Sequence, residues 1–163
     1  MEMWRELCGR FGLRRSPEAC EARQGELFLQ ALPGHAQPAP GAVRLVGALR
    51  REGVRLGLAS SSARPWIEGV LAVIGLGEAF EVVVSGDDVV RGKPDPEIFL
   101  LAAERLGVTP TACTVIEDSR HGVAAALAAG MAVVAVRTAY NADEAFTGTQ
   151  RVVASLEELV PAG

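Results

Sequence analysis

Short apolar runs alternate with helix-length segments from Val54 to the C-terminal end of the chain. The runs rich in β-branched residues predict strands, at 54–59, 80–85, 114–117, 131–136 and 151–153. The segments between them predict helices at 65–74, 96–106 and 121–129, and the Ser155–Glu158 capping box predicts a last helix. Strands that alternate with helices are typical of βαβ units. We therefore expect an α/β fold, a Rossmann-like parallel sheet with helices on both faces.

The first forty residues follow a different pattern. Two helices are predicted, one at 3–10 and one that begins at Ser16 as N-cap and Pro17 as first helical residue and runs towards Leu32. A Pro- and Gly-rich linker, residues 33–42, and an amphipathic helix at 42–52 lead into the first strand. The sequence thus predicts a small helical cap and linker at 1–40 and an α/β core at 41–163.

Composition narrows the class of protein. Of 163 residues, 49% are hydrophobic and 22% are charged, which is enough apolar material for a packed core. The net charge of −4 and the lack of a basic run argue against a nucleic-acid partner. The apolar stretches are too short for a membrane span, and the charged N-terminus does not resemble a signal peptide. We expect a soluble, monomeric cytoplasmic protein, with its three cysteines as free thiols.

Three of the predicted strands lead into polar residues suited to one task. Ser60, Ser61 and Ser62 follow the first strand, where hydroxyl and amide groups at a helix N-terminus can bind phosphate. The second leads to Lys93, the only lysine among 16 basic residues, held by Pro94 and Pro96. In an open parallel sheet the carboxyl ends of the strands meet at one edge, where ligands bind.

The third strand ends in Glu117 and Asp118, hard oxygen ligands of the kind that Mg²⁺ prefers. Each feature also has a purely structural interpretation. Ser62 could serve only as an N-cap, Lys93 could be a solvated surface residue, and the two acids could stabilise a helix N-terminus. The two histidines are far apart and carry no metal-ligand spacing.

The three features in this order resemble motifs two to four of the haloacid dehalogenase-like superfamily, in its β-phosphoglucomutase and phosphatase branch. The resemblance covers about residues 38–159 and includes GLASSS, SGDDVVRGKPDPEIF and VIEDSRHGVAAALAAGM. It implies that Ser60, with the amide of Ser61 and the neighbouring Ser62, binds the transferring phosphoryl group. It also implies that Lys93 bridges this group to the nucleophile.

The resemblance further implies that Asp118 is a direct Mg²⁺ ligand and that Glu117 lies beside it in the metal site, partly through water. Asp87 and Asp88 match a variable loop and are expected to be solvated. The adjacent carboxylates suit a metal-dependent phosphatase rather than a dehalogenase. The order of Lys93 and Asp118 also differs from that of response-regulator receivers.

The family's first motif, Asp-x-Asp-Gly after the leading strand, supplies the nucleophile and the general acid/base. No aspartate precedes Asp87, so we expect the first core strand to be missing and the chain as given to be inactive. An oligomer could form if another strand takes that place. The resemblance implies a phosphatase or phosphomutase acting on a small phosphorylated metabolite. The alternative is a non-catalytic relative that binds phosphate, metal or a protein partner.

Overall fold

The computed structural model describes residues 2–161. Six α-helices are described: α1 Glu2–Phe11, α2 Pro17–His35, α3 Ala42–Arg51, α4 Arg64–Val73, α5 Glu97–Leu106 and α6 Arg120–Ala128. The strands are β1 Gly57–Ala59, β2 Val82–Val84, β3 Thr114–Glu117, β4 Ala132–Val136 and β5 Arg151–Val153. Three single-turn 3₁₀ helices complete the elements: η1 Gly86–Asp88, η2 Pro110–Ala112 and η3 Leu156–Leu159.

The chain divides into two compact units, one ending at Ala36 and the other beginning at Gln37. In the first unit, α1 and α2 pack against each other. Helix α2 begins as predicted, because the Ser16 hydroxyl accepts a hydrogen bond from the amide of Ala19. No helix among residues 2–161 is long and apolar enough to cross a bilayer.

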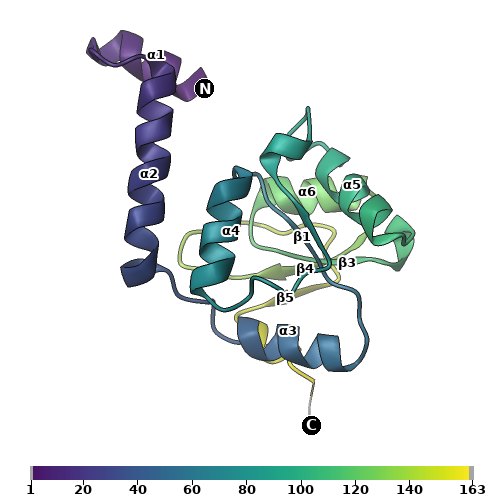
Figure 1. Ribbon diagram of the computed structural model, residues 1–163. Coiled ribbons are helices and arrows are strands. Elements are labelled where there is room, and N and C mark those ends of the chain that lie inside the picture. The colour runs from purple at the N-terminus through teal and green to yellow at the C-terminus, as the bar shows by residue number, and fades with distance from the viewer. Residues whose placement is uncertain (1, 162–163) are drawn as a thin grey trace. The chain divides into compact units, whose positions relative to one another are not determined.

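The second unit holds the strands, and every pairing among them is parallel (Figure 1). This confirms the expected α/β class with parallel strands. Strand β1 pairs with β2, with Leu58 opposite Val83, and a separate three-stranded sheet has the order β3-β4-β5. Within residues 2–161, β1 and β3 therefore each have one edge without a strand partner. Ile116 on β3 is 40% exposed.

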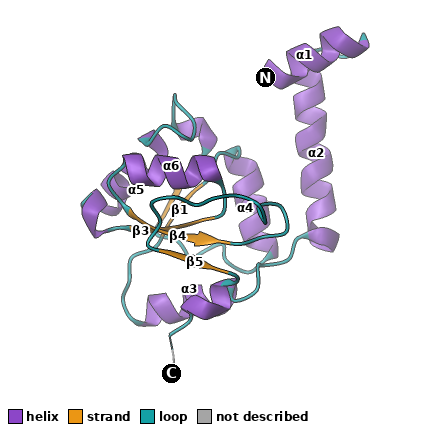
Figure 2. Cartoon of the chain, turned by 180° about the vertical axis from the view of Figure 1, so that it is seen from behind, coloured by secondary structure: helices purple, strands orange, loops and turns teal. Residues whose placement is uncertain are grey.

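Helices cover both faces of the strands, with α5 and α6 on one side and α3 on the other (Figures 1 and 2). Alternation along β2 shows why both faces are apolar. Val82 and Val84 pack on the core formed with α5 and α6, whereas Val83 packs on the smaller core that includes Ile67 and Leu71 of α4. The expected arrangement of helices on both faces is thus observed.

Some predicted boundaries were wrong. Helix α2 continues through Pro33 to His35, so the irregular linker begins only after these residues. The segment after Ser155 forms the 3₁₀ turn η3 rather than an α-helix. The Ser155 hydroxyl accepts a hydrogen bond from the amide of Glu157, and the predicted capping box with Glu158 does not form. Strand β1 contains three of the six residues predicted for it.

Candidate active site

The ammonium group of Lys93 joins the ends of two strands that do not pair with each other. Its Nζ lies 3.3 Å from the carbonyl oxygen of Ala59, the last residue of β1, and 2.8 Å from Oε2 of Glu117, the last residue of β3. The side chains of Lys93 and Glu117 are each 11% exposed, and the ammonium also lies 4.7 Å from the ring centre of Phe99. Lys93 is therefore a directed, largely buried cation rather than a solvated surface residue.

The serine loop, Ser60–Ser62, leaves β1 beside this ammonium group. The amide of Ser60 donates to Val84 on β2, at 2.9 Å, which extends the pairing of the two strands by one residue. The hydroxyl oxygen of Ser60 accepts from the amide of Ser62 at 3.2 Å. Ser61 and Ser62 are exposed, and α4 begins at Arg64, so the loop presents polar groups at the N-terminus of a helix.

The carboxylate of Glu117 is held on both oxygens. Oε2 accepts from Lys93, while Oε1 accepts from the amides of Asp118 and Ser119 and, at 2.9 Å, from the Ser119 hydroxyl. Burial alone would raise the pKa of Glu117. The hydrogen bond and the charge of Lys93, with the bonds from Ser119, hold the pKa of this carboxyl below its ordinary value.

Asp118 has the opposite electrostatic character. Burial raises the pKa of its carboxyl, and the adjacent negative charge of Glu117 raises it further. A cation at this position would relieve both effects. Mg²⁺ takes few protein carboxylates and completes its shell with water and phosphate, so Asp118 fits as one ligand. No three acidic, histidine or cysteine side chains within residues 2–161 gather into a metal site.

Asn141 fixes the backbone of Asp118 from the loop after β4. Its amide group donates to the carbonyl oxygens of Asp118, at 2.7 Å, and Val136, at 2.9 Å, and its Oδ1 accepts from Thr138. Asn141 is 4% exposed. Sequence reasoning missed this residue, because a single asparagine 23 positions downstream carries no motif.

The expectation that Asp87 and Asp88 are solvated is wrong for Asp88. The Asp88 side chain is 17% exposed and lies between two arginines, Arg64 and Arg105. Asp87 is exposed, yet its carboxylate accepts from the amide of Arg64 at 2.8 Å. The structure thus places the ammonium group of Lys93 against Glu117 and against the end of β1 that leads to Ser60. It adds a second charged cluster, centred on Asp88, next to the serine loop.

Comparison with known proteins identifies the family of this chain. The model of the haloacid dehalogenase-like hydrolases matches residues 4–130. The chain belongs to this family. CbbY from Rhodobacter sphaeroides, solved in complex with phosphate, has a TM-score of 0.85 and 29% sequence identity over 90% of this chain and 67% of its own.

The relatives of this chain include phosphatases. The bifunctional riboflavin kinase/FMN phosphatase of Arabidopsis thaliana is 44% identical over 74% of this chain and 32% of its own length. Phosphoglycolate phosphatase of Escherichia coli is 37% identical over 72% of this chain and 47% of its own length. The chain spans less than half of the length of either protein.

Proposed function

We propose that this chain is the phosphate- and metal-binding part of a Mg²⁺-dependent phosphoryl-transfer enzyme for a small phosphorylated metabolite. One observation carries the proposal: Lys93 links the end of β1, where the serine loop begins, to the end of β3, where Glu117 and Asp118 lie. Groups that neutralise a phosphoryl group thereby share one edge of the fold. The phosphatases among the relatives favour this reaction class.

The donors at this edge have capacity left for a phosphate. An ammonium group has three hydrogens, and Lys93 directs them toward two protein acceptors, Ala59 and Glu117. The Ser60 oxygen accepts a hydrogen bond within its loop, which leaves the hydroxyl hydrogen to donate. With the amide of Ser61 and the exposed hydroxyl of Ser62, whose own amide donates to Ser60, these groups form the phosphate-binding set. Donors fixed before the reaction stabilise charge at little cost in reorganisation.

Asp118 would hold Mg²⁺ directly, and Glu117 would reach it through water, because both oxygens of Glu117 already accept hydrogen bonds. The bound ion supplies charge neutralisation at the phosphoryl oxygens. Within the protein, Glu117 holds the Lys93 ammonium group in place. The role of Asn141 is to fix the peptide of Asp118.

The acceptor of the phosphoryl group is, in this proposal, an aspartate on a strand between β1 and β3. Four protein donors reach Glu117, and Asp118 is assigned to the metal, so neither is free to attack. The unpaired edges of β1 and β3 and the 40% exposure of Ile116 favour a further strand here, since central strands of such sheets are buried. On this proposal, residues 1–163 lack the aspartate that accepts the phosphoryl group and show no turnover by themselves.

Two proteins compared side by side test this proposal. One is the 163-residue chain, and the other carries an N-terminal extension with an apolar strand ending in Asp-x-Asp-Gly. We expect Mg²⁺-dependent hydrolysis of p-nitrophenyl phosphate by the extended protein and none by the short one. A version of the extension with Asn in place of the first Asp is the matched control. Robust turnover by the short chain would show that the acceptor lies within it.

A second function is favoured because, within residues 2–161, neither carboxylate at this edge is free to accept a phosphoryl group: a non-catalytic relative that binds phosphate, metal or a protein partner. It predicts that the short chain binds inorganic phosphate at Ser60–Ser62 and Lys93, and that the extended protein gains no turnover. Turnover by the extended protein excludes this alternative.

A further inference from the structure

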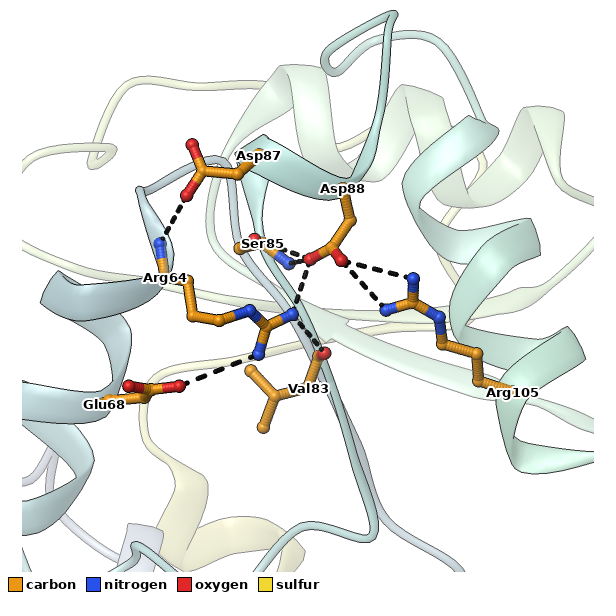
Figure 3. Close-up of polar contacts among 7 residues, drawn as sticks. All are labelled: Arg64, Glu68, Val83, Ser85, Asp87, Asp88 and Arg105. Carbon is orange, nitrogen blue, oxygen red and sulfur yellow. Dashed lines mark hydrogen bonds and ion pairs between the residues drawn. The ribbon is translucent and has the colours of Figure 1, made fainter.

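A second charged cluster is centred on Asp88 and includes Arg64, two residues after the serine loop (Figure 3). Oδ2 of Asp88 accepts from the amide of Ser85 at 2.8 Å, from its hydroxyl at 2.6 Å and from Nη2 of Arg64 at 2.6 Å. Oδ1 accepts from both terminal nitrogens of Arg105 at 3.2 Å. The Asp88 carboxylate thus accepts five hydrogen bonds, more than a carboxylate in an exposed surface ion pair accepts.

The cluster joins three elements that are distant in sequence. Arg64 is the first residue of α4, Asp88 is the last residue of η1, and Arg105 lies in the last turn of α5. Arg64 also donates to the carbonyl oxygen of Val83 on β2, at 3.1 Å. Ser85 is fully buried, and its hydrogen bonds, with those from the two arginines, hold the pKa of the Asp88 carboxyl far below its usual range. Asp88 is therefore charged throughout the physiological pH range.

The turn that Asp88 closes is packed on the backbone of the serine loop. The amide of Gly86 donates to the carbonyl oxygen of Ser62 at 2.9 Å. A Cβ atom at position 86 would overlap the carbonyl oxygen of Ser61, so the two backbones are in direct contact. On the other side, the amide of Ser60 donates to Val84. The serine loop is thus fixed along its length by β2 and by η1, the turn that follows β2.

The start of α4 depends on the same turn. Its N-cap residue, Ala63, has no side chain that could accept from the first helical amides. Asp87 supplies an acceptor to the amide of Arg64, and Asp88 binds the guanidinium group of the same residue. Asp88 therefore holds the helix that follows the serine loop and, through Arg105, the helix that follows Lys93.

We propose that Asp88 is a positioning residue, which holds the Ser60–Ser62 loop in its phosphate-binding shape through Ser85, Arg64 and Arg105. This inference rests on the proposed function, because it assigns the loop a phosphate ligand. Asp88 itself does not touch the phosphate. Its effect reaches the loop through the Gly86–Ser62 hydrogen bond and the position of α4.

Amide hydrogen exchange in the 163-residue protein, without phosphate, tests the positioning role directly. In Asp88→Asn we expect the amides of Ser60 and Gly86 to exchange about tenfold faster, as in a local opening. The amide of Gln150, bonded to Val133 in the other sheet, should keep its rate. Equal acceleration at all three amides, or none at Gly86, would overturn the proposal.

Two further variants sharpen the comparison. Glu68→Gln is the matched control, because Glu68 is exposed and reaches Arg64 only at 3.9 Å (Figure 3). It should leave all three amides unchanged. Arg105→Gln removes only the outer half of the cluster from a side chain that is 40% exposed. Arg105→Gln should accelerate exchange at Ser60 and Gly86 by less than Asp88→Asn does, and should leave Gln150 unchanged. This variant tests the positioning role even if Asp88→Asn does not fold.

Titration with inorganic phosphate, followed by the amide signals of Ser60–Ser62, separates this inference from the proposed function. We expect the wild type and Glu68→Gln to bind equally and Asp88→Asn to bind about tenfold more weakly, as for other supporting residues of binding sites. Equal binding by Asp88→Asn would overturn the positioning role. No response of these amides in the wild type would instead refute the proposed phosphate site, whereas the exchange rates would still decide whether Asp88 holds the loop.

Discussion

The carboxylate of Glu117 occupies the space that a side chain at Gly122 would fill. A Cβ atom added there would overlap Cδ and Oε2 of Glu117. Gly122 is also the residue whose amide donates to the Ser119 hydroxyl at the start of α6. The first turn of this helix therefore approaches the Lys93–Glu117 pair so closely that only glycine fits. This close approach explains the glycine in the VIEDSRHG segment.

Gly122→Ala should destabilise the protein by about 1–3 kcal/mol, the usual cost of forcing an extra group into a packed site. The displaced Glu117 carboxylate would lose its 2.8 Å contact with Lys93. Chemical denaturation monitored by circular dichroism gives the free energy of unfolding. Gly47→Ala is the control, since Gly47 lies inside α3 and a Cβ atom there would lie 3.5 Å from the flexible side chain of Arg51.

In the control, alanine in a helix interior should stabilise the protein by about 0.5–1 kcal/mol. The two substitutions are chemically identical and are expected to have opposite signs. A stabilising Gly122→Ala would contradict the close packing described for Glu117.

The position of a candidate site residue can be predicted from the sequence where it depends on local order along the chain. Ser60 directly follows β1, Glu117 ends β3, and Lys93 lies in the loop after β2, and parallel strands bring such positions to one edge. Asn141 and the Asp88 cluster could not be predicted this way. Asp88 binds arginines 24 and 17 positions away, and neither pairing has a spacing that identifies it.

The division into two sheets also depends on long-range pairing. Each strand was predicted from its own apolar run, but the run does not reveal which neighbour it pairs with. The 3₁₀ turn η3 shows a different limit: Ser155 is the N-cap as predicted, but an N-cap residue does not distinguish a 3₁₀ turn from an α-helix.

Asp118→Asn should make the isolated chain slightly more stable at neutral pH, by a few tenths of a kcal/mol, about the size of other exposed substitutions. The raised pKa of Asp118 means that folding disfavours its charged form. The charged Asp118 carboxylate therefore lowers the free energy of unfolding at a pH above the ordinary carboxyl range, and this effect is absent in acid. Thermal unfolding at pH 3 and pH 7 measures the difference.

The same variant should lose the stabilisation that Mg²⁺ gives the wild type. Calorimetric titration with Mg²⁺ is expected to show weak binding to the wild type, because one or two carboxylates form only part of an Mg²⁺ shell. Tight binding that survives Asp118→Asn would place the metal elsewhere.

Asn141→Ala should lower the free energy of unfolding by about 1–3 kcal/mol, because it leaves the carbonyl oxygens of Asp118 and Val136 without this donor. Thr138→Ala is a suitable comparison: the Thr138 hydroxyl accepts only from the amide of the exposed Tyr140, at 3.3 Å. It should cost less than Asn141→Ala. Equal effects of the two variants would show that the contact with Asp118 contributes nothing specific.

Lys93→Met tests the buried ion pair by its dependence on pH. In the wild type, the pKa of Glu117 is lowered, so the pair contributes stability that is present above the ordinary carboxyl pKa of about 4.3. This contribution is lost as the pH falls through the lower, folded-state pKa. The methionine variant leaves a carboxylate that is 11% exposed without its cation, which should cost about 2–4 kcal/mol at pH 7.

The difference between wild type and Lys93→Met should therefore shrink as the pH approaches 3, where Glu117 in the variant is protonated. Introducing Lys93→Met into a Glu117→Gln background separates the charge interaction from the packing of the lysine stem on Phe99. There the cost should be smaller and independent of pH, because glutamine carries no charge to leave unpaired. Urea denaturation of the four proteins at pH 3, 5 and 7 provides the comparison. A cost of Lys93→Met that is the same at every pH and in both backgrounds would mean that Lys93 contributes only its apolar stem, and the phosphate-neutralising role proposed for its ammonium group would lose its structural basis.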